Sequence, residues 1–217
     1  MNTTAIKLIV NLWHDDMPED PNEMDGWSAY SFSRRHGNYK NPEDISDEDE
    51  DGNGVPDAEL QKKLDAGLAF FLDYYEHGQC SWSLAGEGPQ CQFDTTRMAG
   101  LIVWEQDEGD IGATTVEDRR KDAKAFIERF TLWCNGEVYG YTVEAVTKCH
   151  ACGADEEGCV DFDLPSCGGF YSDDLDYMVE TIKESIGDDW SDYEVKFKDD
   201  TGVYLADECK RLWKDDK

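Results

Sequence analysis

Alternating apolar and polar positions predict β-strands along much of the chain. Residues 5–13 place Ile6, Leu8 and Val10 on one face of a two-residue period, the pattern of a half-buried strand. The aromatic-rich segment 27–33 predicts a second strand, which we expect in the same sheet as the first. Further strands are predicted over residues 79–84, 100–106, 137–147, 160–170 and 193–197.

Helical spacing of apolar residues predicts four helices. The first covers residues 60–75, and Gly78 supplies its stop. Thr115 followed three positions later by Asp118 is a capping-box variant that predicts the start of a second helix, which ends at Asn135. The last two predicted helices, one capped by Ser172 and one near the end of the chain, carry apolar stripes at Leu175, Met178, Val179, Ile182 and Ile186, and at Leu205, Cys209 and Leu212.

The order of these elements indicates the fold class. Strands and helices intermix without a regular βαβ period, which favours one α+β domain over residues 1–217, with a largely antiparallel sheet and three to four helices. Hydrophobic residues make up 39% of the chain and aromatic residues 12%, enough for a sizeable core. Residues 38–58 are expected to form an exposed acidic loop, and residues 148–168 a cysteine-containing excursion.

The formal charge changes this picture more than any motif does. Fifty Asp and Glu residues stand against 20 Lys and Arg residues, which gives a net charge of -30 at pH 7. Such a field repels nucleic acid, anionic lipid and phosphorylated substrates, and it attracts basic protein surfaces. Thirty charges match those of about 15 base pairs of duplex DNA. The charge therefore favours a DNA mimic that occupies a basic site, while a generic solvated surface and adaptation to high salt stay open as alternatives.

Four acidic segments, residues 15–25, 43–59, 105–118 and 173–189, are the candidate contacts with such a basic partner. Spaced aromatic side chains would supply the anchors of the interface. Neither direct nucleic-acid binding nor membrane binding is expected. The acids that we single out for partner binding are Asp15, Asp16, Asp47, Glu48, Asp49, Glu50, Asp51, Asp107, Glu108, Asp173 and Asp174.

The cysteines suggest a metal site. Cys149 and Cys152 form a C-x2-C-G turn, and Cys159 and Cys167 follow, so four thiolates could close a tetrahedral structural zinc site. Free thiols are an equally open reading, because a zinc ribbon would normally show a second C-x2-C pair. The first residues carry neither a basic flank nor a cleavage site, so we expect a cytoplasmic protein in which the eight cysteines form no disulfide framework.

A second metal candidate lies in the acidic loop. Its oxygen ligands would come from Asp49, Asp51, Asn53 and Asp57, with spacing similar to that of a calcium loop. Leu60 stands where the bidentate acid of such a loop is normally found. The prediction is therefore either weak calcium binding or a solvated acidic turn.

Several blocks of the chain carry a family resemblance: WSAYSFSRRH from Trp27, LDAGLAFFLDYYEHGQCSWSLAGEGPQCQFD from Leu64, AGLIVWE from Ala99, FIERFTLWCNGEVYGYTVE from Phe126 and SCGGFY from Ser166. Together they resemble a family of proteins without an assigned activity that tailed bacteriophages encode. The resemblance implies the cytoplasm of an infected bacterial host, where phages use acidic proteins to inhibit host-defence enzymes that bind DNA. It carries no catalytic residue over to this chain.

Catalytic motifs are otherwise missing from the sequence. It contains no GxGxxG, Walker A, HExxH or GxSxG pattern, and His36, His77 and Cys80 form no recognisable nucleophile and base arrangement. The sequence therefore favours a binding protein over an enzyme. A zinc-containing phage accessory enzyme or regulator, and an acidic structural or assembly protein, stay open as alternatives.

Overall fold

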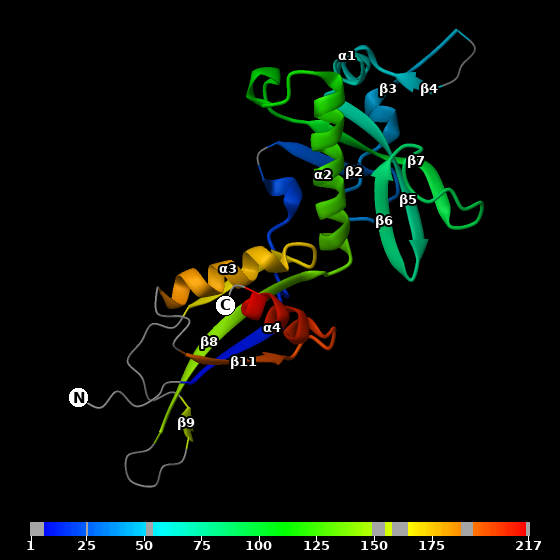
Figure 1. The fold of residues 1–217 in the computed structure, drawn as a ribbon. Helices are drawn as coiled ribbons and strands as arrows, with labels where there is room; N and C mark the ends of the chain where they lie inside the picture. The colour runs from blue at the N-terminus through cyan, green and yellow to red at the C-terminus, as the bar shows by residue number, and fades with distance from the viewer. Residues whose placement is uncertain are drawn as a thin grey trace. The chain divides into compact units, whose positions relative to one another are not determined.

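The computed structural model describes residues 7–24, 26–50, 54–148, 155–157, 165–187 and 193–215. The chain divides into two compact units (Figure 1). The terminal unit comprises Met1–Pro18 and Gly136–Lys217, and the middle unit comprises Glu19–Asn135. Within the described ranges, no helix is long and apolar enough to cross a membrane.

The middle unit is built on a four-stranded antiparallel sheet with the order β2-β7-β5-β6. One long helix, α2, packs on one face of the sheet, and the short helix α1 with a two-stranded hairpin packs on the other. The elements are η1 (Pro21–Glu23), β2 (Trp27–Ser31), η2 (Pro42–Ile45), β3 (Ser46–Glu48), β4 (Gly54–Pro56), α1 (Ala58–Ala66), β5 (Ala69–His77), β6 (Gln79–Leu84), β7 (Thr95–Trp104), η3 (Glu108–Asp110) and α2 (Val116–Cys134).

Strand alternation explains how one sheet serves two cores. Leu72 and Ile102 face α2 and contact a cluster that contains Phe130, whereas Ala69 and Leu101 face the opposite cluster around α1. Successive strand residues point to opposite faces, so a strand covered on both sides is apolar at nearly every position. That is the reason why residues 69–72 of β5 and 101–104 of β7 form continuous apolar runs.

The first predicted helix is wrong over its second half. Helix α1 ends at Ala66, and the chain continues as strand β5 rather than as helix. Gly67 makes the stop, because its φ of 69° lies in the left-handed region that favours glycine, and its N–H donates to Leu64 and Lys63 carbonyls. Aromatic residues after Gly67 favour a pleated strand, and their apolar run fits either period.

Helix α2 confirms the predicted helix start, with Thr115 as its N-cap. The Thr115 hydroxyl accepts from the Asp118 N–H at 3.1 Å and donates to the Asp118 carboxylate at 2.7 Å. Asn135 follows the helix as its C-cap. The buried face of the helix carries Arg119, Ala123, Ile127 and Phe130.

Removal of this cap should have a moderate effect. Thr115→Ala is expected to lower the free energy of unfolding by about 1 kcal/mol, because one N–H of the first turn loses its acceptor. Denaturant unfolding measures the change. Thr115→Ser keeps the hydroxyl and should retain most of the stability, and equal losses in both variants would contradict the capping role.

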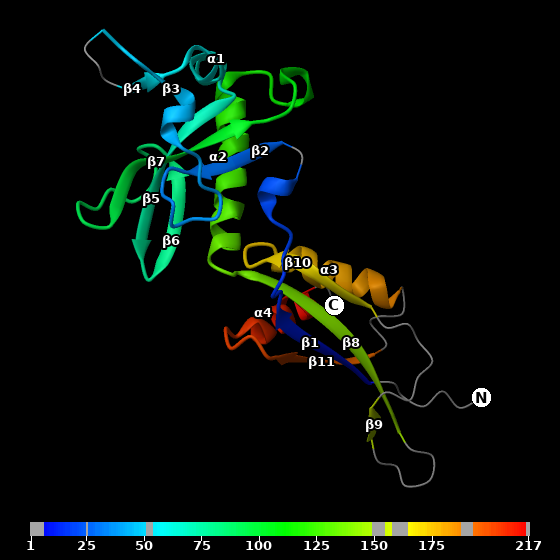
Figure 2. The same ribbon diagram turned by 180° about the vertical axis from the view of Figure 1, so that it is seen from behind.

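The terminal unit has a second sheet, with the order β10-β8-β1-β11 and β9 paired to β8. Helices α3 and α4 lie on one face of it (Figures 1 and 2), where Met178, Ile182 and Trp213 pack against Val10 and Tyr141. The elements are β1 (Lys7–His14), β8 (Val138–Lys148), β9 (Asp155–Glu157), β10 (Ser166–Tyr171), α3 (Leu175–Ile186), β11 (Glu194–Asp199) and α4 (Leu205–Asp215).

The α+β class, the largely antiparallel pairing and the number of α-helices are confirmed for the described residues. The exception in pairing is β1 with β11, which are parallel. The expectation that residues 5–13 and 27–33 share a sheet is wrong, because β1 and β2 belong to different sheets. Ser172 does not cap α3 either, since its hydroxyl donates to Glu137 at 2.8 Å and Asp174 occupies the N-cap position.

The segment 38–58 is not a simple loop. It contains η2 and the β3–β4 ladder, in which Asp47 pairs with Val55 and Glu48 with Gly54. Ile45 from this segment packs against the cluster of Leu60 and Leu101. A local apolar contact and a ladder thus give residues 38–50 and 54–58 a regular backbone structure that the composition does not predict.

Candidate functional site

The acidic hairpin holds the densest group of predicted partner contacts. Asp47, Glu48, Asp49 and Glu50 have exposed side chains on β3 and the turn that follows it. The backbone of Asp47 and Glu48 is paired in the ladder to β4. Asp51 lies outside the described residues. An ordered row of exposed carboxylates is suited to a basic surface, because little conformational entropy is lost when it binds.

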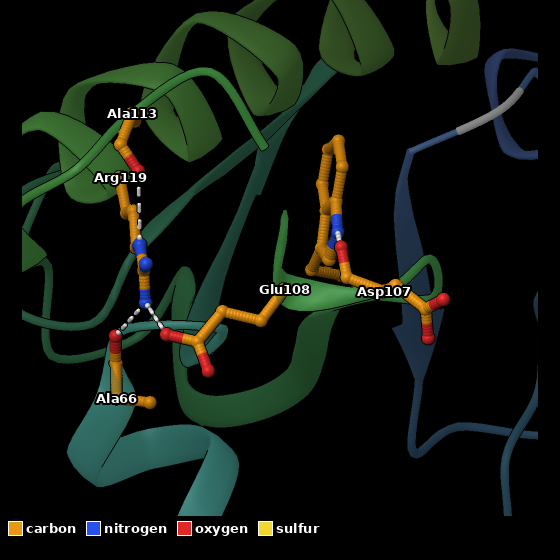
Figure 3. Close-up of polar contacts among 6 residues, drawn as sticks. Ala66, Asp107, Glu108, Ala113 and Arg119 are labelled. Atoms are coloured by element: carbon orange, nitrogen blue, oxygen red, sulfur yellow. Dashed lines mark hydrogen bonds and ion pairs between the residues drawn. The ribbon is translucent and has the colours of Figure 1, made fainter. Parts of the chain in front are cut away.

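The second acidic group consists of Asp107 and Glu108, and Glu108 forms contacts within the middle unit (Figure 3). Glu108 forms an ion pair with Arg119 at 2.9 Å, and the same guanidinium donates to the carbonyls of Ala66 at 2.8 Å and Ala113 at 3.2 Å. Arg119 is only 9% exposed, so its role is structural. The exposed side chain of Asp107 remains available, while its backbone carbonyl accepts from the Trp104 indole at 3.1 Å.

The acids of the terminal unit have mixed roles. The Asp15 carboxylate accepts from the N–H groups of Gly169 at 3.0 Å and Met17 at 3.2 Å, which links the residue that follows β1 to the backbone of β10. Asp16 and Asp173 are exposed, and Asp174 begins α3. The predicted acids therefore divide between structural and exposed positions on both units.

The predicted metal sites are only partly within the described residues. Cys149, Cys152 and Cys159 lie outside them, and Cys167 is an exposed thiol in β10 that contacts the Gly168 carbonyl at 3.6 Å. Zinc binding, and with it the accessory-enzyme alternative, stays a prediction.

The predicted calcium site is also only partly described, since Asp51 and Asn53 are outside the described residues. Asp57 already accepts from the N–H groups of Glu59 and Leu60 as the N-cap of α1. Across the described part of the chain, His, Cys, Asp and Glu residues form no group of three that could hold a metal ion. Calcium binding at this loop therefore stays a prediction.

The middle unit also contains a pocket that sequence analysis missed. It is a hollow of about 410 Å³ lined by Asp20, His36, Gly37, Asn38, Tyr74, Glu76, Gly78, Cys80, Trp82, Phe130, Trp133, Cys134 and Asn135. The volume lies in the range of small-ligand sites. Lining residues such as Glu76 and Gly78 are exposed, so the hollow is open to solvent.

An aromatic cluster forms one wall of this pocket. The rings of Tyr74 and Trp82 have centroids 4.6 Å apart, and the His36 ring meets them edge-on at 5.1 Å and 5.5 Å. Burial and the charge of Arg35 lower the pKa of His36, with Glu76 acting in the opposite direction. Burial, with Cys80 and Glu76 nearby, raises the pKa of Tyr74 to about 12. Both rings are therefore neutral at pH 7.

Side chains at the C-terminal end of α2 hold strand β6, which forms part of the pocket wall. β6 is the edge strand of its sheet, and the side chains of Thr131 and Asn135 form hydrogen bonds with its backbone. The Asn135 amide accepts from the Cys80 N–H and donates to the Cys80 carbonyl, both at 2.9 Å, and Thr131 binds the Trp82 N–H at 3.0 Å. These contacts cover an exposed sheet edge and hold the wall in place.

Two cysteines meet in the pocket. A hydrogen bond with the Cys80 thiol raises the pKa of Cys134. Neither cysteine forms a disulfide. A raised pKa keeps the thiol protonated at pH 7, which does not favour a nucleophilic role, because the thiolate is the reactive form.

Comparisons of the chain with protein-family models, with curated proteins and with solved structures give no match. The phage resemblance therefore stays a prediction, and the function must be argued from charge and geometry.

The pocket residues come from four separate parts of the chain. His36, Tyr74, Trp82 and Trp133 all fall in blocks that carry the phage resemblance. Their richness in Trp and Tyr is the one sequence signal that points to them. It does not separate a ligand pocket from core packing, because the contacts between α2 and β6 that create the hollow are long-range.

Proposed function

We propose that the protein is a phage-encoded acidic binding protein whose carboxylates occupy the basic, nucleic-acid-binding site of a host protein. The observation that carries the proposal is the net charge of -30. Even if all 20 basic side chains were paired with acids, 30 carboxylates would remain uncompensated. A surface of this kind attracts a basic partner over long range and accelerates association.

The placement of the acids supports the proposal. The row Asp47–Glu50 is exposed on an ordered hairpin, and Asp16, Asp107 and Asp173 are exposed elsewhere. A mimic of a nucleic acid needs charges on a rigid framework, because a flexible acidic tail would lose entropy when it binds. In the middle unit, the pairing of β3 with β4 fixes the backbone of Asp47 and Glu48, which supports the proposal.

Affinity capture tests the proposal. Tagged protein is incubated with lysate of a bacterial host, and bound proteins are eluted either by steps of salt or by duplex DNA. We expect one basic nucleic-acid-binding protein to be released by both treatments. A retained partner that ignores both DNA and salt would contradict the proposal and favour the assembly-protein alternative.

A further inference from the structure

The pocket of the middle unit has the chemistry of a cation site. Tyr74, Trp82 and Trp133 contribute aromatic rings, and Asp20 and Glu76 contribute carboxylates to the lining. Neither lysine nor arginine is among its described lining residues. Aromatic faces attract cations through their quadrupole, and nearby carboxylates add a direct charge interaction.

His36 and the two asparagine amides of the pocket add no positive charge that would repel a cation. His36 is uncharged at pH 7 because burial and Arg35 disfavour its protonated form. The amides of Asn38 and Asn135 are already engaged with backbone groups, at Ala29 and Cys80. Anionic ligands such as nucleotides are disfavoured by the two carboxylates and by the charge of the whole chain.

We propose that this pocket binds the guanidinium group of an arginine side chain that the basic partner inserts between the aromatic wall and the carboxylates of Asp20 and Glu76. The identity of the partner rests on the function proposed above. Arginine is favoured over lysine because guanidinium is planar, stacks on aromatic faces, is weakly hydrated and can bind carboxylates with two parallel hydrogen bonds. An arginine anchor in an aromatic pocket is also a common centre of binding energy at protein interfaces.

A small probe tests the pocket without the partner. N-acetyl-L-arginine amide is titrated into the full chain, and binding is followed by calorimetry and by NMR shifts of the indole N–H groups. We expect saturable binding. N-acetyl-citrulline amide, which has the same shape without the charge, should bind at least about tenfold more weakly, and equal binding of the two probes would overturn the proposal.

Matched variants locate the site. Asp20→Asn with Glu76→Gln removes two charges from the pocket, whereas Asp47→Asn with Glu48→Gln removes two charges from the hairpin, so both double variants carry a net charge of -28, which is -30 plus 2. Asn at position 20 can still accept the Asn22 N–H, so folding should be preserved and is checked by the melting temperature. The pocket variant should bind the arginine probe at least about tenfold more weakly, and the hairpin variant within twofold of the parent. Equal losses would overturn the proposal.

The source of the guanidinium is tested separately. A pocket for a partner side chain recognises only the guanidinium, so free L-arginine, whose ammonium and carboxylate charges cancel, should bind no more tightly than the blocked amide. Tighter binding of the free amino acid would overturn the assignment to a partner side chain. If only the pocket variant loses binding of the arginine probe, the pocket proposal is supported. If DNA also fails to compete for the partner, only the proposed function is overturned. Absence of probe binding overturns the pocket and leaves the proposed function standing.

Discussion

Replacing Asp73 by alanine is expected to lower the free energy of unfolding of the middle unit by about 2–4 kcal/mol, because it removes a buried carboxylate that accepts three hydrogen bonds. The side chain is 3% exposed in the centre of β5. Its carboxylate accepts from the N–H groups of Gly86 and Met98, both at 2.9 Å, and from the Gln90 amide at 3.0 Å. A hydrogen bond to a charged group contributes about 1.5–3 kcal/mol, and water can replace part of this loss because Gly86, Gln90 and Met98 are exposed.

Denaturant unfolding of the full chain measures this effect. Asp47→Ala is the matched control, since it removes an exposed carboxylate, and should change stability by no more than about 0.5 kcal/mol. Asp73→Asn keeps one oxygen acceptor and should fall between the two. A loss for Asp73→Ala no larger than that of the control would contradict the structural role of the carboxylate.

Lowering the pH should remove the stabilisation that the Asp73 carboxylate provides. Burial raises the pKa of Asp73, but the hydrogen bonds from Gly86, Met98 and Gln90, with the charge of Arg97, outweigh it, so the pKa lies below its ordinary value of 3.8. A carboxyl whose folded pKa is depressed stabilises fully above the unfolded pKa, and its contribution is lost as pH falls through the folded pKa. The difference between the parent and Asp73→Asn should therefore shrink below about pH 4. A constant difference down to pH 2 would contradict this assignment.

Charge reversal on the hairpin should weaken partner binding strongly. The double variant Asp47→Lys with Glu48→Lys carries a net charge of -26, which is -30 plus 4. We expect a loss of about tenfold or more in affinity for the captured partner, mainly through the association rate, because these charges are exposed on an ordered ladder. Binding kinetics to the immobilised partner give the rate constants.

The control for this prediction is Asp65→Lys with Glu128→Lys. These two acids are also exposed and give the same net charge, but they lie outside the acidic segments. If both double variants lose affinity equally, the total charge matters and the hairpin does not. Raising the salt from 50 to 200 mM should weaken binding of the parent by about tenfold or more, and an affinity indifferent to salt would contradict a charge-driven interface.

Local signals in the sequence predicted the elements that depend on local physics. Thr115 and Asp118 mark the start of α2 because a capping box involves only neighbouring residues. Residues 60–75 were misjudged, since an apolar run such as Phe70-Phe71-Leu72 fits both a helix face and a strand covered on two sides. Gly67 decides between them, and its left-handed backbone is visible only in the structure.

The pairing of strands that lie far apart in the chain could not be predicted from the sequence. Nothing local indicates that β1 pairs with β11 in parallel, nearly 190 residues later, or that β1 and β2 belong to different sheets. The pocket has the same origin, because Asp20, His36 and Trp133 meet only after α2 packs on the sheet. The acids were recognisable as a class, but their division between ion pairs, caps and exposed positions depends on tertiary contacts such as Arg119 with Glu108.

Direct competition with DNA tests the central claim most closely. The captured host protein is purified and bound to a fluorescently labelled duplex, and the acidic protein is added while fluorescence anisotropy is recorded. We predict that the protein displaces the duplex competitively, so that its apparent affinity falls in proportion to the concentration of DNA, and that the hairpin reversal Asp47→Lys with Glu48→Lys displaces it poorly. Simultaneous binding of DNA and the acidic protein to the partner would contradict the account.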